Sequence, residues 1–371
     1  MRNYRKEEEF SVRKYLVAGL MALTASPVLA GGVERSTQSM AILFQEGRYI
    51  EIGAQFARPR VSGDASGPFN PASGPTGNIA RRVFHGSLAY KADINEQVSY
   101  AIILDEPIGA DVSYPSGTDA FLSGSKAKID STALTGVLRY SFGNGFSAYA
   151  GVRSVWSKGS VDLVFAPPAV PSTYTMQTNR DQAWGYLLGA AYEIPEIAAR
   201  VSLTYNSKVK HKFDQTVNGM AMPDGFETTI PESLHLEFQS GIAEDTILMG
   251  SVRWVRWQDF NISPAGNPNL VSYDRNSVTY TLGVGRRFNE NWSGSVMLGY
   301  DTGNGKTTGN LQPVSSRRSI GLGASYTVDN ITISGGVQYS RFGDATTRSP
   351  VNGTFSGNSM IGAGVRVGFS F

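Results

Sequence analysis

The stretch DQAWGYLLGAAYEIPEIAARVSLTYNSKVKHKF, residues 181–213, contains two runs in which apolar side chains occupy every second position. Trp184 and Tyr186 begin the first run, and Val201 begins the second, after a short turn that contains Pro195. A period of two is typical of β-strands, so the stretch predicts a β-hairpin. Strands of this kind, with aromatic-edged apolar faces, fit either a soluble sandwich or a membrane barrel whose polar face points into the lumen.

The first 30 residues predict export. A charged start is followed by an apolar run and then by Pro27-Val28-Leu29-Ala30. Small residues at Val28 and Ala30 suit cleavage after Ala30, as in a secretory signal peptide. The apolar run is well short of the ~20 residues that a membrane-spanning helix needs, which argues against the alternative of a membrane anchor. We therefore expect residues 1–30 to be a signal peptide.

The composition of the remaining chain excludes several classes of protein. The leader holds five of the 33 Lys and Arg and three of the 31 Asp and Glu, which leaves 28 of each and no net charge. A neutral chain lacks the basic footprint of nucleic-acid binding, so we expect no nucleic acid partner. The absence of cysteine excludes disulfides and thiolate metal sites. The 42 glycines, the many aromatics and the lack of a spanning helix after Ala30 indicate an all-β outer membrane protein.

Alternating segments separated by turn residues number fourteen. They lie near residues 48–61, 80–92, 97–107, 128–142, 146–158, the two halves of 181–213, 230–241, 246–260, 274–288, 292–301, 317–328, 331–342 and 359–371. Six short turns alternate with seven long loops rich in Pro, Gly, Ser, Thr and Asn. An even strand count with this asymmetry is typical of bacterial outer membrane barrels, with the turns periplasmic and the loops outside. We predict a 14-stranded antiparallel transmembrane β-barrel with a short N-terminal plug segment.

The last strand carries a further signal. From Ile361 to Phe371, apolar side chains alternate with glycines and polar residues. A terminal Phe on an alternating strand resembles the signal read by the outer membrane assembly machinery, which we expect as a partner together with outer membrane lipids. The alternative is an ordinary closing strand.

Four stretches resemble the FadL-type transporters of long-chain fatty acids and other hydrophobic compounds. They are AWGYLLGAAYEI (183–194), RVSLTYNSKVKHKF (200–213), TIPESLHLEF (229–238) and SVRWVRWQDFNI (251–262). Weaker similarity covers AILFQEGRYIEIGAQFARPRVSG (41–63), where the plug of the family passes into the first strand. The resemblance implies passive uptake of a hydrophobic molecule such as a fatty acid. It implies capture on extracellular loops, binding in the lumen and lateral exit through the wall near strand three.

The expected plug is short. Residues 31–46 show no clean period of two, and residues 47–371 are expected to form the barrel. Family members usually carry a longer plug that contains Asn-Pro-Ala. This chain has an Asn-Pro-Ala at Asn70-Pro71-Ala72, in the first long loop, where we expect a turn. The resemblance therefore does not carry over gating by the N-terminus.

Apolar side chains in two long loops are candidates for ligand capture. They are Val161, Leu163, Phe165, Tyr174 and Met176 in the third loop, and Met220, Met222 and Phe226 in the fourth. A long apolar molecule needs an apolar surface on which to cross the polar lipopolysaccharide layer, and flexible Met suits varied ligands. A compatible alternative is that these loops pack on each other as a lid.

Four cations are candidates for holding a carboxylate head group inside the barrel. Strand parity predicts an inward direction for Arg153, Lys208, Lys210 and Arg253. Since a charge pair is stronger where water is sparse, such cations would suit a fatty acid. The alternative is that they pair with luminal acids such as Asp105 and Glu237.

The third strand is predicted to be weakest at Pro107 and Gly109. Pro removes a ladder donor and Gly weakens pairing, and the family's lateral exit lies at such a kink. The alternative is a strand that simply ends there.

His235 and Glu237 share an inward face, but three histidines and no placed serine nucleophile argue against a lipase-like enzyme. We expect no catalytic residue, no metal and no cofactor.

Three functions remain open from the sequence. A transporter of hydrophobic ligands is favoured by the four matching stretches and the apolar loops. A general diffusion porin would need an open, charged lumen without a plug, and a structural or adhesive barrel would show neither uptake nor ligand.

Overall fold

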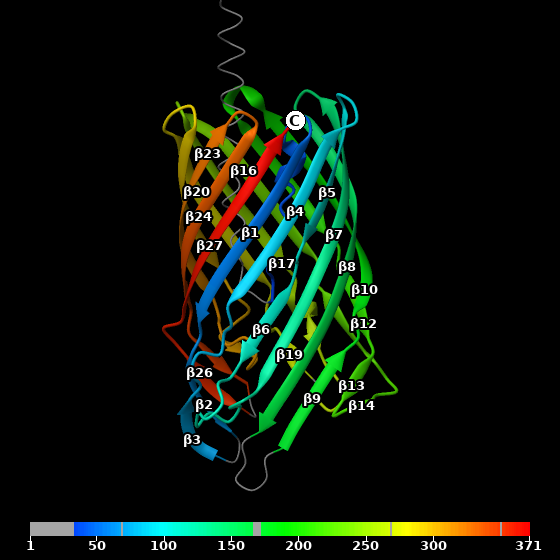
Figure 1. Ribbon diagram of the computed structural model, residues 1–371, viewed down its shortest axis with the longest axis vertical. Coiled ribbons are helices and arrows are strands. Elements are labelled where there is room, and N and C mark those ends of the chain that lie inside the picture. Colours follow the sequence, from blue (N-terminus) through cyan, green and yellow to red (C-terminus); the bar gives the residue numbers. More distant parts are fainter. Residues whose placement is uncertain (1–32, 68–69, 166–171, 268, 349–350) are drawn as a thin grey trace, which may run out of the picture.

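The computed structural model describes residues 33–371 except 68–69, 166–171, 268 and 349–350, so the expected signal peptide lies outside the described residues. Fourteen antiparallel strands of this part form the wall of a closed barrel (Figure 1). In order around the wall they are β1 (Tyr49–Arg60), β4 (Val83–Asp93), β5 (Val98–Asp105), β7 (Lys126–Gly143), β8 (Phe146–Phe165), β10 (Asp181–Ile194), β11 (Ala199–Asn206), β16 (Ser233–Ala243), β17 (Thr246–Val255), β20 (Ser277–Arg287), β21 (Trp292–Asp301), β23 (Arg317–Val328), β24 (Ile331–Phe342) and β27 (Ser359–Ser370). Because β1 pairs with both β4 and β27, the wall has no free edge. The predicted fold class is confirmed.

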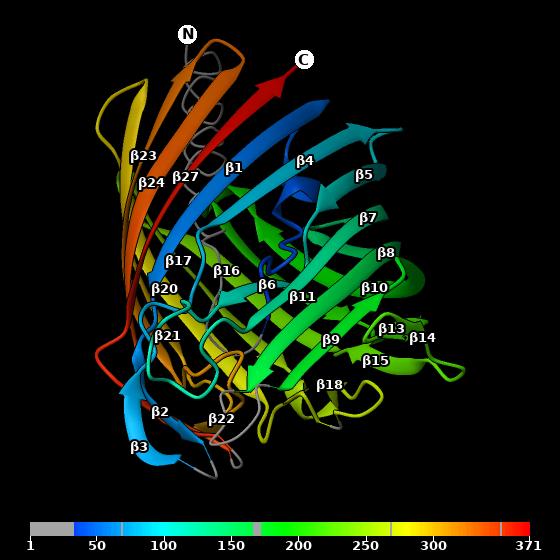
Figure 2. The same cartoon turned by 60° about the horizontal axis from the view of Figure 1, so that its bottom comes forward.

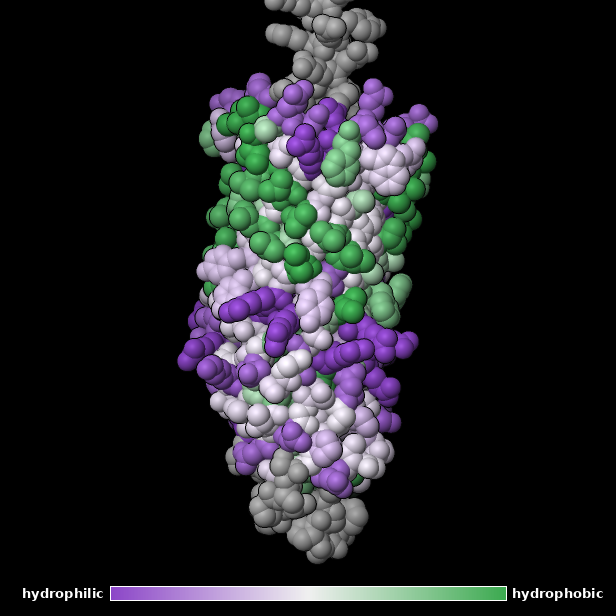
Figure 3. Space-filling model, turned by 90° about the vertical axis from the view of Figure 1, so that its left-hand side faces the viewer, coloured by the Kyte–Doolittle hydropathy of each residue, from purple (hydrophilic) through white to green (hydrophobic). Residues whose placement is uncertain are grey.

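The outer face of the wall is apolar. In β10, Trp184 and Leu188 are 65% and 51% exposed, whereas Leu187 between them is fully buried. Figure 3 shows hydrophobic side chains forming a belt around one face of the barrel, with hydrophilic side chains above and below it. Soluble proteins rarely expose a continuous apolar surface of this extent. The alternation therefore places the apolar side chains toward lipid and excludes the soluble sandwich.

Short turns join the strands at one end of the barrel, where the C-terminus also lies (Figure 1). Several of these turns need a positive φ angle, which Asn144 (φ 45°) and Asp329 (φ 50°) adopt. Asn and Asp tolerate this region better than other side chains do, which explains their place in the tight hairpins. The segments at the opposite end, by contrast, are long.

The long loops contain more regular structure than the sequence predicts. They contribute β2 (Gly63–Gly67), β3 (Asn70–Pro75), β6 (Gly109–Ser113), β9 (Ser172–Thr178), β12 (Val209–Phe213), β13 (Gln215–Val217), β14 (Met220–Ala221), β15 (Phe226–Ile230), β18 (Asn261–Ile262), β19 (Val271–Ser272), β22 (Thr307–Thr308), β25 (Ala345–Thr347) and β26 (Asn352–Phe355). The turn expected at Asn70-Pro71-Ala72 is instead the start of β3. Three short 3-10 helices, η1 (Ala41–Phe44), η2 (Pro195–Ile197) and η3 (Trp257–Asp259), complete the described chain, in which no helix is long and apolar enough to cross a membrane.

The segment from Val33 to Phe44, called the plug below, lies inside the barrel (Figure 2). Toward the turn end, Met40 and Leu43 are buried against inward side chains of the wall such as Val137. Toward the loop end, Val33 packs in a cluster with Ile108 and Trp257. The plug therefore follows the inner wall from the loop side to the start of β1.

Candidate functional site

An apolar cavity lies inside the barrel on the loop side. It holds roughly 750 Å³ of empty space, its open mouth included. Its apolar lining includes Val33, Ile108, Val112, Ile129, Val161, Met176, Phe213, Phe226, Phe260, Leu270 and Tyr273. These side chains come from the plug, the wall and the loops together, so the cavity exists only when all three are assembled. We call it the loop-side cavity.

The lining also includes basic residues: His211, which is buried, and Lys128 and Lys158, whose side chains are exposed. His211 Nδ1 lies 2.8 Å from Asp181 Oδ2, and its Nε2 has no hydrogen-bond partner among the described residues. Burial lowers the pKa of His211 below its ordinary value, although the nearby Asp181 carboxylate acts in the opposite direction. The imidazole is therefore neutral at pH 7, and it offers the cavity a single polar atom.

A second cavity of roughly 590 Å³ adjoins the first and extends toward the wall. It shares Val33, Ala110, Val112 and Leu311 with the loop-side cavity. Its other apolar lining includes Pro59, Val61, Ile79, Val83, Val314 and Phe342. Since β4 and β6 contribute to it, this wall-side cavity reaches the break in the third wall strand.

The third wall strand is interrupted between β5 and β6. Pairing between β4 and β5 ends at Leu88 and Leu104, so residues 83–87 of β4 pair only with β1. The break itself bonds to the plug, because Gly109 N donates to Val33 O at 2.8 Å and Arg35 N donates to Pro107 O at 2.9 Å. The predicted weak residues thus lie at an unpaired part of the wall, called the wall gap below.

Three charged or polar side chains close the inner side of the wall gap. Arg35 Nη1 lies 3.3 Å from Glu106 Oε2, and His85 Nδ1 lies 3.6 Å from the same oxygen. The Arg35 guanidinium packs directly on Gly109, where an added Cβ would approach Arg35 Cζ to 2.3 Å. Glycine at this position is therefore explained by close approach as well as by weak pairing. Sequence reasoning missed Arg35, His85 and Glu106, since only the folded barrel brings them together.

Two of the predicted head-group cations do face inward. Arg153 and Arg253 are both buried in the lumen. Arg253 donates from Nε and Nη2 to Glu34 Oε1 of the plug, at 3.0 and 2.5 Å. Arg153 bonds to Gln38 of the plug and to Asn206 of β11. Both guanidinium groups are therefore engaged by the protein itself.

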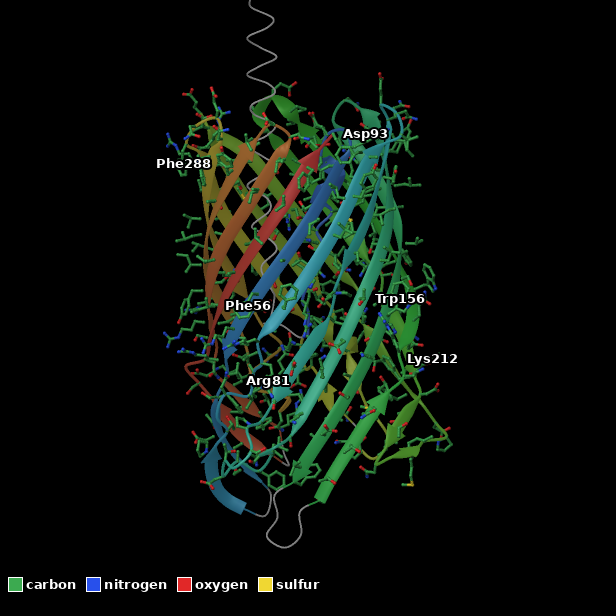
Figure 4. The ribbon with its side chains drawn as sticks, in the orientation of Figure 1. Phe56, Arg81, Asp93, Trp156, Lys212 and Phe288 are labelled. Atoms are coloured by element: carbon green, nitrogen blue, oxygen red, sulfur yellow. The ribbon has the colours of Figure 1, made fainter. Side chains whose placement is uncertain are left out.

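The inward direction predicted for Lys208 and Lys210 is wrong. Asn206 and Ser207 are both buried. Ser207 is held inward by two hydrogen bonds to Tyr186: its Oγ accepts from Tyr186 N, and its own N donates to Tyr186 O. Two successive inward residues reverse the alternation, so Val209 points inward while Lys208 and Lys210 are exposed. Lys212, which follows the same parity, points away from the barrel in Figure 4.

The luminal acids bond to the plug rather than to the predicted cations. Ser36 Oγ donates to Asp105 Oδ2 at 2.7 Å, and Ser39 Oγ donates to Glu237 Oε1 at 2.6 Å. Phe44 of the plug lies under two further luminal guanidinium groups, Arg139 and Arg200, at 4.4 and 4.1 Å from its ring centroid. These luminal charges therefore hold the plug.

Comparison with known proteins agrees with this architecture. The family described as outer membrane protein transport protein (OMPP1/FadL/TodX) matches residues 39–363. The chain belongs to the FadL/TodX family. It is accordingly an outer membrane transporter of hydrophobic compounds, not an enzyme, and it spans the bacterial outer membrane many times.

Solved structures show the same barrel. A FadL homologue from Pseudomonas aeruginosa has a TM-score of 0.73 at 17% identity and covers 89% of this chain and 92% of its own. The Pseudomonas putida toluene transporter TodX has a TM-score of 0.63 at 13% identity, with 94% and 96% covered. The Ralstonia pickettii toluene transporter TbuX has a TM-score of 0.61 at 15% identity, with 94% and 97% covered. A search of curated protein sequences finds no significant match.

The loop residues expected on an exposed capture surface are, with one exception, buried or partly buried in this FadL/TodX-family barrel. Val161, Leu163 and Met176 are buried in one cluster, which Phe165, Tyr174, Met222 and Phe226 cover. Of the eight candidates, Met220 alone is exposed, at 67%. The reason is that β8 continues to Phe165 and pairs with β9, so the strand alternation extends through the predicted loop. The loops pack as a lid, and Val161, Met176 and Phe226 contribute to the loop-side cavity beneath it.

Proposed function

We propose that this protein carries neutral hydrophobic molecules passively across the outer membrane. The observation that carries the proposal is the loop-side cavity, whose lining is mainly apolar. Its one buried basic side chain is the neutral imidazole of His211, because the side chains of Lys128 and Lys158 at its margin are exposed. A carboxylate within this cavity would lose its hydration without gaining a buried cation, which is strongly unfavourable. The toluene transporters TodX and TbuX, whose barrels resemble this one, act on a molecule of the neutral class.

Long-chain fatty acids are the second candidate, and the resemblance of the four sequence stretches favours them. The luminal cations that such a ligand would need, Arg153 and Arg253, already bond to Gln38 and Glu34. A fatty acid would have to displace the plug from these groups before its head group could bind. A neutral hydrophobic molecule could bind without displacing the plug from these cations.

The proposed path has three steps. A molecule enters beneath the lid into the loop-side cavity and passes Ala110 and Val112 into the wall-side cavity. It then leaves sideways into the hydrocarbon of the membrane through the wall gap, when Arg35 moves away from Gly109. Lateral exit suits such a ligand, because it never has to cross the aqueous periplasmic end of the barrel.

Blocking the junction between the cavities tests the path and the ligand class together. Ala110→Trp fills space that both cavities share, whereas Ala150→Trp adds the same side chain to the exposed outer face of β8. We expect Ala110→Trp to abolish most uptake of toluene in cells matched for barrel abundance, and Ala150→Trp to leave it unchanged. Protein-dependent uptake of oleate with no uptake of toluene would refute the neutral class.

A reversible staple across the wall gap tests lateral exit. The chain has no cysteine, so His85→Cys with Glu106→Cys is joined specifically by a short bis-maleimide that contains a reducible disulfide. The matched control joins Leu88→Cys and Leu104→Cys, which are already paired across β4 and β5. We expect the first staple to stop uptake until it is reduced, and the control staple to have no effect. Normal uptake through the stapled gap would mean that the lumen empties elsewhere.

The porin alternative makes a different prediction. A general diffusion porin conducts ions steadily, whereas a barrel filled by the plug should show little conductance in a planar bilayer. Steady porin-like conductance of the intact protein would favour that alternative.

A further inference from the structure

Five outward arginines form a continuous row on one side of the barrel. Four of them lie on β23, β24 and β1, and the fifth, Arg82, immediately precedes β4. With β27, these are five consecutive strands of the wall. The row consists of Arg318, Arg341, Arg60, Arg58 and Arg82, all exposed. The strand register joins them, because Arg318 lies directly opposite Arg341 and Ser359 lies opposite both Arg341 and Arg60.

The arginine row marks the boundary of the apolar belt. For four of the five members, the residue two positions away on the side of the belt is an exposed apolar or aromatic one: Ile320, Tyr339, Phe56 and Phe84. On β27, the exposed Ile361 lies two positions from Ser359. On the face seen in Figure 3, hydrophilic side chains gather directly below the green belt, on the side of the long loops. In Figure 4, Phe56 is labelled above Arg81, the neighbour of Arg82 in sequence. The guanidinium groups therefore lie where hydrocarbon ends and the polar outer surface begins.

The row has no compensating charge within the described residues, where none of its members makes an ion pair or a side-chain hydrogen bond. Like charges directly opposite each other on a sheet are destabilising, as Arg318 and Arg341 are. Three other cations near the loop side of the wall do have acidic partners. Lys128 lies 3.0 Å from Asp130, Lys212 lies 3.3 Å from Glu227, and Arg256 lies 3.0 Å from Glu232.

We propose that the arginine row binds the phosphorylated headgroup of lipopolysaccharide in the outer leaflet. Guanidinium groups bind phosphate with paired, charge-assisted hydrogen bonds, and a row of them matches a headgroup that carries more than one phosphate. The aromatic and aliphatic side chains beside the row contact the acyl chains of the same lipid. The position at the membrane boundary selects an amphiphile, since a soluble anion has no reason to concentrate there. The row thereby fixes the depth of the barrel and anchors one lipid beside the wall gap, which begins next to Arg82.

Lipid binding to the detergent-purified full-length protein tests this site. The probes are bisphosphorylated lipid A, enzymatically dephosphorylated lipid A and inorganic phosphate. The variant is Arg318→Gln with Arg341→Gln, and the matched control is Lys126→Gln with Lys128→Gln on the outer face of β7. We expect the arginine variant to bind bisphosphorylated lipid A roughly tenfold or more weakly, as loss of charged hydrogen bonds predicts, and the control to bind as the parent does.

Each of these binding comparisons can overturn the proposal. Equal binding by the arginine variant and the control would remove the site. Equal binding of the dephosphorylated lipid would show that the acyl chains alone carry recognition. Displacement of the lipid by inorganic phosphate at similar concentration would show a soluble anion site instead. Heat-modifiability on gels verifies folding, and if the double variant does not fold, Arg341→Gln compared with Lys128→Gln decides the same question.

Discussion

Removing the Arg253 side chain should release the plug. In the native barrel, Arg253 holds Glu34 through two hydrogen bonds, and both side chains are buried. Arg253→Met keeps the apolar stem but leaves the Glu34 carboxylate buried without its main partner. Breaking a buried ion pair in this way costs about 3–5 kcal/mol. We expect the lower end, because Arg317 also interacts electrostatically with Glu34.

A loss of about 3 kcal/mol corresponds to a roughly 10²-fold larger population in which the plug is detached. Hydrogen–deuterium exchange measured by mass spectrometry reports this population directly. The amides of Arg35 and Gly109 are the best probes, since both bond across the plug and the wall gap. Their exchange should accelerate by about that factor. Arg286→Met on β20 is the matched control, because Arg286 is exposed, has no ion pair within the described chain and lies outside the arginine row.

The double variant Glu34→Gln with Arg253→Met separates charge from packing. It removes both charges, so no carboxylate stays buried alone, and exchange should return most of the way to the native rate. If the double variant exchanges as fast as Arg253→Met, lost packing rather than the unpaired charge is the cause. Native exchange in Arg253→Met would show that the ion pair does not hold the plug.

Three further predictions concern topology, assembly and capture. Cysteine at Pro223 should react with a membrane-impermeant maleimide on intact cells, and cysteine at Asn144 should react only after permeabilisation; labelling of both on intact cells would contradict the orientation. Deleting Phe371 should lower the amount of heat-modifiable barrel in outer membrane fractions, and unchanged amounts would refute the terminal assembly signal. Met176→Ser, in the cavity wall, should reduce toluene uptake more than the exposed Met220→Ser, and equal effects would place capture outside the cavity.

The wall could be predicted from the sequence because each strand carries its own signal. In β10, Trp184 and Leu188 alternate with small residues, and the same pattern repeats through β27. The alternation can be recognised within each strand alone. In a closed barrel of this kind, each strand then pairs with the strands that precede and follow it in the sequence. The break at Pro107 could be predicted for the same reason, since proline acts on its own backbone.

The site could not be predicted as well because it depends on contacts between distant segments. One unexpected inward residue, Ser207, reverses the parity of everything that follows it and sends Lys208 outward. The length of β8 depends on pairing with β9, which buries Leu163 in a segment that composition predicts to be a loop. The plug sequence shows no clean period of two, so its contacts could not be predicted, although its polar side chains bond to partners throughout the lumen.

These plug contacts connect the lumen to the wall. In the proposed lateral exit, opening the wall gap would require Arg35 to leave Gly109, and Arg35 is bonded through its own backbone to Pro107. Its neighbour Glu34, which forms an isolated β-bridge with Ile108, is held through its side chain by Arg253. On that proposal, a movement that frees the wall gap would strain the buried ion pair, and a ligand that displaces Val33 from either cavity would loosen both. Even a plug of this length would then couple cavity occupancy to lateral opening, because its bonds to the break and to the lumen are made by adjacent residues.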